Sequence, residues 1–126
     1  MAYDFAAFYQ NLGVKYFAQA RQTEDSMRRD KLLSAAELSL EMGLDAGLTQ
    51  NISHPRYAQL LYNLCVVKVY KSRDSDTLHI VRDLLERAQK LTDSSRSKQN
   101  HLCDQIRHLQ NRVFKKLGKE ALGLLS

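Results

Sequence analysis

Apolar side chains recur at intervals of three and four residues through almost the whole chain. Phe5, Tyr9, Leu12 and Tyr16 step by four, three and four, which places them on one face of a helix. Only one proline and five glycines occur among the 126 residues. No segment alternates apolar and polar residues as a half-buried strand does. The sequence therefore predicts an all-α fold.

Breaks in this pattern divide the chain into five predicted helices. Their approximate bounds are 3–21, 26–42, 54–70, 75–92 and 96–122. The third is apolar on several sides, which is typical of a central, well-covered helix. Short loops favour antiparallel neighbours. We therefore expect one domain over 1–126, in which residues 3–92 form two helical hairpins and the last helix packs against their end.

The ends of the helices carry recognisable capping residues. Thr23 or Asp25 is a candidate N-cap for the second helix, and Ser75 for the fourth. Gly43 or Gly47 can take the left-handed conformation that ends a helix. We therefore expect the second helix to end near residue 42 and a loop to follow over 47–54.

Residues 9–16 read YQNLGVKY and place Leu12 and Gly13 between two tyrosines. This spacing resembles the opening of a tetratricopeptide repeat, whose first helix follows the pattern W-x-x-L-G-x-x-Y. In that family the glycine lies where the two helices of a hairpin cross. The resemblance implies that a small residue of the second helix, Ala35 or Ala36, faces Gly13.

The second hairpin resembles the family less closely. Its first helix has no glycine at the matching place and offers Cys65 or Val67 there, in two competing registers. The fourth helix ends in ERAQKLTD, which resembles the end of a repeat with Ala88 as its small residue. Neither hairpin has the proline that closes a repeat.

The resemblance implies a binding module. In the family, the first helices of stacked hairpins line a groove that holds peptides or partner helices. Matched residue by residue, Gln10, Val14 and Phe17 fall on positions that face this groove. The alternative for Phe17 is a place in the core.

The last predicted helix is basic. Residues 96–126 hold seven Lys or Arg against two Asp or Glu, whereas residues 1–50 hold five against seven. At about 100° per residue, most of the cations lie opposite the apolar face of this helix. The basic face comprises Arg107, Arg112, Lys115, Lys116 and Lys119.

Three interpretations of this basic face are open. It is a solvated face near a helix C-terminus, where the dipole favours cations; it attracts an acidic protein partner; or it neutralises phosphates of nucleic acid. Nucleic acid is the second functional choice, since the sequence shows no helix-turn-helix or zinc-binding pattern.

The sequence shows no catalytic motif. It has no phosphate-binding glycine loop, nucleophile elbow or acid pair. His101, Asp104 and His108 share one side of the last helix, but the lysines and arginines there repel a metal ion, so we expect an Asp104–His108 ion pair instead. Cys65 and Cys103 lie in apolar stripes and are expected to be reduced and unreactive, with a disulfide as the alternative. We therefore expect neither enzymatic activity nor a cofactor.

Together these features predict a small cytoplasmic adaptor or chaperone-like subunit that holds a peptide or helix of another protein. The competing class is a helical nucleic-acid-binding protein that acts through the basic face. A third class is a regulator that self-associates through the last helix. The start lacks the pattern of a secretory signal, and no run approaches the roughly 20 apolar residues of a membrane span.

Overall fold

The computed structural model describes residues 3–93 and 100–125, with side-chain surroundings for 3–93 and 101–118. Five helices follow one another along the chain, and no strand occurs in these ranges. They are α1 (Phe5–Gln22), α2 (Ser26–Gln50), α3 (His54–Lys71), α4 (Ser75–Asp93) and α5 (Asn100–Leu125). The all-α prediction is confirmed, as are two antiparallel hairpins followed by a long last helix.

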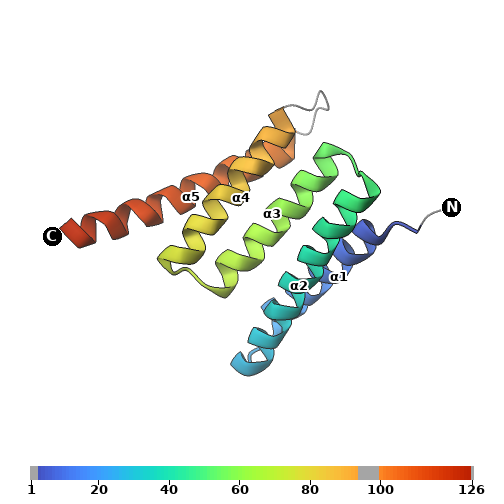
Figure 1. Cartoon of the computed structure of the whole chain (residues 1–126). Helices are drawn as coiled ribbons and strands as arrows, with labels where there is room; N and C mark the ends of the chain where they lie inside the picture. Colours follow the sequence, from blue (N-terminus) through green and yellow to red (C-terminus); the bar gives the residue numbers. More distant parts are fainter. Residues whose placement is uncertain (1–2, 94–99, 126) are drawn as a thin grey trace.

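Each helix packs against the next one in the chain, and α1 also touches α3 (Figure 1). In Figure 1, α2, α3 and α4 lie side by side, with α1 behind α2. Helix α5 runs back along α4, and its last turns extend beyond the other helices. Along the chain, α1, α3 and α5 therefore alternate with α2 and α4.

Helix α3 is central because it contributes to two separate hydrophobic clusters. Leu60, Leu64 and Val67 pack against buried residues of α1 and α2, among them Ala6, Ala36 and Leu40. The opposite side of α3 packs against α4 and α5. That second cluster comprises Ala58, Leu61, Cys65, Leu78, Val81, Leu85, Ala88, Leu102, Ile106, Leu109 and Val113. The breadth of the apolar pattern in this helix therefore reflects burial on both sides, as predicted.

The structure decides between the two registers left open for the second hairpin. The Cys65 thiol faces α4, where its Sγ lies 3.8 Å from the Val81 carbonyl oxygen. Val67 faces the other way and packs with α2. Cys65 therefore lies at the contact between α3 and α4, and Ala88 of α4 is buried in the same cluster.

In the first hairpin, Gly13 is buried against α2. A Cβ atom at this position would lie 3.3 Å from the Ala36 carbonyl oxygen. Ala36 is fully buried, whereas Ala35 is only partly buried. Of the two alanines that the resemblance offered, Ala36 is the one that faces Gly13.

The predicted end of α2 is wrong. The helix continues through Gly43 and Gly47 to Gln50, so most of the expected loop over 47–54 is helical. Gly43 is buried where Leu60 of α3 and Tyr9 of α1 both approach α2. The helix ends instead at Asn51, which adopts the left-handed conformation with φ 53° and ψ 53°. Packing of the glycines against neighbouring helices therefore outweighs their low helix propensity.

The N-caps also depart from the prediction in one place. Asp25, one of the two candidates, caps α2 by accepting a hydrogen bond from the Met27 N–H at 3.0 Å. At α4 the cap is Asp74 and not Ser75, because Asp74 accepts a 2.7 Å hydrogen bond from the Thr77 N–H. Ser75 is the first residue of the helix itself.

Candidate functional site

Three pockets that share lining residues form a groove across α1, α3 and α5. The pocket at α1 shares Tyr62 and Val66 of α3 with the next one. That middle pocket in turn shares Arg73 and Arg112, among others, with the pocket at α5. We call these three the apolar pocket, the middle pocket and the basic pocket, and together the groove.

The apolar pocket has a volume of about 220 Å³ between α1, α2 and α3. Its lining is Gly13, Val14, Phe17, Leu40, Tyr62, Asn63, Val66 and Val67. Within this lining, Gly13 lies directly beside Leu40 of α2. None of the described side chains that line this pocket is charged.

Phe17 and Tyr70 close the space between α1 and α3 at one end of these helices. Their rings lie 5.2 Å apart, centroid to centroid, in an edge-to-face arrangement. The Arg21 guanidinium lies 5.9 Å from the centroid of the Phe17 ring and makes a cation–π contact with it. Tyr70 remains 43% exposed and also lines the middle pocket.

The middle pocket, of about 280 Å³, lies between α3 and α5. It combines aromatic, apolar and cationic side chains. They are Tyr62, Val66, Val69, Tyr70, Arg73, Gln105, His108, Leu109 and Arg112. Burial raises the pKa of the Tyr62 hydroxyl, and the positive charge of Arg112 lowers it by a smaller amount.

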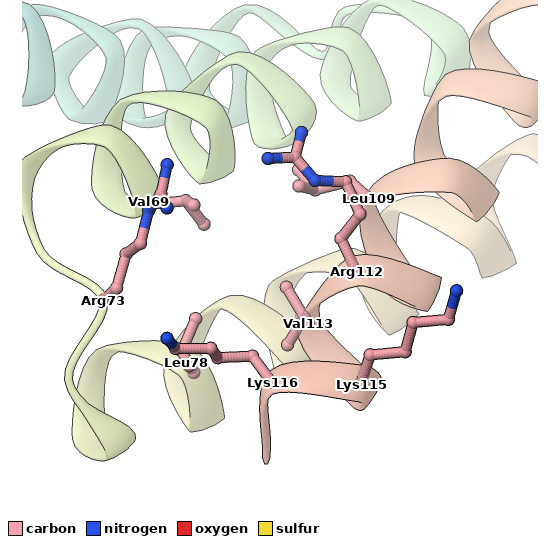
Figure 2. Close-up of a pocket in the computed structure, with 8 residues that line it drawn as sticks. All are labelled: Val69, Arg73, Leu78, Leu109, Arg112, Val113, Lys115 and Lys116. Carbon is pink, nitrogen blue, oxygen red and sulfur yellow. The ribbon is translucent and has the colours of Figure 1, made fainter. Parts of the chain in front are cut away.

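The basic pocket, of about 220 Å³, lies between the α3–α4 connection and α5 (Figure 2). Figure 2 shows Arg73 and Arg112 on opposite sides of this pocket, with Lys116 reaching across toward Leu78. Lys115 lies on the outer side. Beneath these cations the floor is apolar and consists of Val69, Leu78, Leu109 and Val113.

The four cations of the basic pocket form no ion pair with any residue whose side chain the structure describes. By contrast, two lysines of α3 are paired: Lys68 and Lys71 both bind the Glu37 carboxylate of α2, at 3.0 and 3.2 Å. A positive potential therefore remains at the α5 end of the groove.

Of the three predicted groove residues, Val14 and Phe17 line the apolar pocket. Val14 is 49% exposed. Phe17 also packs against the adjacent core cluster, which is the alternative expected for this residue. Gln10 is partly buried and does not line the groove.

Of the five predicted basic residues, Arg112, Lys115 and Lys116 come together in the basic pocket. Arg107 is exposed on α5 and lines none of the three pockets. The Lys119 side chain lies outside the described residues. Lys116 borders the apolar stripe of α5 instead of lying opposite it, because it lines the same pocket as Val113.

Sequence analysis missed Arg73, Tyr62 and Tyr70. Arg73 lies between two helices, in KSRDSD, and only the return of α5 brings it near the other cations. The two tyrosines continue the helical apolar pattern of α3, so they look like core residues in the sequence. A pattern along one helix gives no signal for residues that meet across three helices.

The cysteines and the other potential metal ligands were the remaining candidates for reactive or metal-binding groups. Cys65 and Cys103 are free thiols, and burial raises the pKa of the Cys65 thiol to about 12. In the part of the chain that the structure describes, no three His, Cys, Asp or Glu side chains are arranged to hold a metal ion. The expected Asp104–His108 ion pair is absent among the described side chains.

None of the described helices is long and apolar enough to cross a membrane. No protein-family model, curated protein or solved structure matches the chain. What the structure itself shows is five helices packed sequentially in antiparallel pairs.

Proposed function

We propose that this protein is a non-enzymatic interaction module, an adaptor or chaperone-like subunit, that holds a peptide or helix of another protein in the groove. One observation carries the proposal: the three pockets are continuous across α1, α3 and α5, helices that are far apart in the sequence. A peptide in an extended or helical conformation is long enough to touch all three helices at once, whereas each pocket alone is small.

The chemistry of the lining supports this proposal. Exposed apolar and aromatic side chains are common at the energetic centre of protein interfaces. Val14 and Tyr70 are 49% and 43% exposed and lie beside the partly buried rings of Phe17 and Tyr62. A partner's apolar side chains would be desolvated in the apolar pocket, and exposed cations would surround its polar groups farther along.

A second candidate is binding of single-stranded nucleic acid. One observation favours it: Tyr62 and Tyr70 line the same pocket as Arg73 and Arg112, so aromatic rings do lie near the cations in space. The apolar pocket offers no cation to a phosphate. The protein partner is therefore the better fit to the groove as a whole.

The test is affinity capture from nuclease-treated and untreated lysates with three baits: the wild type, Val14→Asp and Asn11→Asp. Val14→Asp places a charge in the apolar pocket. Asn11→Asp is the matched control, because Asn11 is exposed and lines a separate hollow on α1 with Leu12 and Lys15. Circular dichroism verifies that both variants are folded.

We expect a stoichiometric protein partner that survives nuclease, is lost with Val14→Asp and is retained with Asn11→Asp. A partner retained by both variants would place the binding site outside the groove and contradict the proposal. Capture that disappears entirely with nuclease would favour the nucleic-acid candidate instead.

A further inference from the structure

The groove changes in chemical character from one end to the other. At α1 its lining is uncharged, and at α5 it carries Arg73, Arg112, Lys115 and Lys116. The first 50 residues, which include α1 and α2, hold five Lys or Arg against seven Asp or Glu. The groove therefore runs from an uncharged end on an acidic part of the chain to a basic end.

On the basis of the proposed function, we infer that the groove has a direction and that its occupant is an acidic amphipathic segment of another protein. The apolar side chains of this segment lie in the apolar pocket, and its glutamate or aspartate side chains lie at the basic pocket.

The unpaired cations support the acidic part of this assignment. Arg73, Arg112, Lys115 and Lys116 are all exposed, and no described carboxylate neutralises them. Like charges around one small pocket repel each other, and a carboxylate that enters relieves this repulsion. Arginine adds directional hydrogen bonding, because its planar guanidinium can hold a carboxylate through two parallel N–H donors.

The apolar floor supports the amphipathic part of the assignment. Val69, Leu78, Leu109 and Val113 lie below the cations, so a ligand in the basic pocket touches apolar surface and charge together. The methylene groups of a glutamate can cover such a floor while its carboxylate reaches the rim. A small hydrophilic anion would leave the floor uncovered.

The uneven charge argues against a nucleic acid as the occupant. Single strands carry a phosphate at every nucleotide, so proteins that bind them place cations along the whole groove. Here even Arg21, which lies over the Phe17 ring, does not line the apolar pocket. A segment with separate apolar and acidic halves matches this distribution.

The test uses the full chain and synthetic peptides with acetylated and amidated ends, so that no terminal charge contributes. One peptide has a leucine- and phenylalanine-rich half followed by a glutamate-rich half. A second replaces every glutamate with lysine. Fluorescence anisotropy measures affinity at low and at physiological ionic strength. We expect the acidic peptide to bind at least about tenfold more tightly than the lysine peptide, with a difference that shrinks as salt increases.

Two variants locate the charge effect. Arg112→Glu should weaken binding of the acidic peptide about tenfold and strengthen binding of the lysine peptide. Arg107→Glu is the matched control, since it makes the same charge change on the exposed surface of the same helix, outside the groove. It should change both affinities by less than about threefold, because only long-range, screened electrostatics act from there.

Direction is measured with a paramagnetic label on either end of the acidic peptide. A label at the apolar end should broaden the methyl resonances of Val14, and a label at the acidic end those of Val113. Equal broadening of both sets by either label would overturn the direction.

Other outcomes overturn the inference and leave the proposed function to its own test, which contradicts that function if the captured partner is indifferent to Val14→Asp or if capture disappears with nuclease. Such outcomes are equal affinity for the acidic and lysine peptides, binding of neither, or tighter binding of a single-stranded oligonucleotide. A dimer that must dissociate before peptide binds would identify a second copy of this chain as the occupant.

Discussion

Gly13 of α1 lies so close to Leu40 of α2 that a Cβ atom at residue 13 would lie 2.7 Å from Leu40 Cγ. Leu40 is only 1% exposed, so its side chain has little room to move away. A glycine inside a helix costs about 1 kcal/mol relative to alanine. The close packing of α1 on α2 explains why a glycine occupies this position despite its low helix propensity.

Gly13→Ala should therefore destabilise the protein although alanine is the better helix former. We expect a loss of about 1–2 kcal/mol in the free energy of unfolding, because overpacking a buried contact costs more than the propensity gains. Urea unfolding followed by circular dichroism measures it. Gly118→Ala is the control, since a Cβ there would meet nothing within 4 Å. Equal stability of the two variants would contradict this account of Gly13.

Glu37→Gln should weaken the attachment of α2 to α3. Burial raises the pKa of Glu37, but hydrogen bonds from Lys68 and Lys71 lower it more, so its pKa lies below the ordinary value. The pair thus stabilises the fold above the unfolded pKa, and this contribution disappears as pH falls through the folded value. At neutral pH we expect a loss of about 1 kcal/mol by urea unfolding.

Glu41→Gln is the matched control for Glu37→Gln. Glu41 is on the same helix but 49% exposed, and its carboxylate lies 3.8 Å from the Lys68 ammonium. Its replacement should change stability by less than about 0.5 kcal/mol. An equal loss in both variants would show that the lower exposure of Glu37 does not strengthen its ion pairs.

Asp74→Ala should lower the melting temperature, and Ser75→Ala should leave it nearly unchanged. The Thr77 N–H and the Ser72 hydroxyl hydrogen-bond to the Asp74 carboxylate and hold its pKa below 3.8. The cap therefore stabilises α4 above this pH and is lost as the pH falls further. Thermal unfolding at neutral and acidic pH measures both effects. A larger change in Ser75→Ala would identify Ser75 as the cap, as the sequence suggested.

The stability of the protein should fall at alkaline pH because of Cys65. Burial raises the pKa of its thiol from 9.0 to about 12, so above pH 9 the thiol ionises in the unfolded chain before it does in the folded one. The unfolded state then binds fewer protons, and this thiol contributes a decrease of up to about 1.4 kcal/mol per pH unit. Urea unfolding at increasing pH measures the slope. Cys65→Ala should remove this part of it, and Cys103→Ala should not.

The number and kind of helices follow from the sequence because the spacing of apolar residues is a local property. One face of α1 needs only Phe5, Tyr9, Leu12 and Tyr16 to be recognised, whatever lies around it. Gly13 likewise indicated a close crossing, and the structure places Ala36 there. At Gly43 and Gly47, low helix propensity wrongly predicted the end of α2. The helix continues there because Gly43 packs against Leu60 and Gly47 packs against Ile52.

The groove was predictable only in part. Val14 and Phe17 were expected from the resemblance, and Arg112, Lys115 and Lys116 from the charge of one helix. These residues form one surface because of the angles at which the helices pack. The spacing of residues along a single helix carries no information about those angles. Arg73 joins the basic pocket solely because α5 folds back beside the α3–α4 connection.

The sequence by itself thus determined an all-helical chain of five segments, a close crossing at Gly13 and a basic last helix, since each depends on neighbours within a few residues. Tertiary structure alone decided that Cys65 faces α4 while Val67 faces α2, and that Tyr62, Tyr70 and Arg73 line one groove. These results depend on contacts between distant residues, whose formation is set by the shape of the whole core.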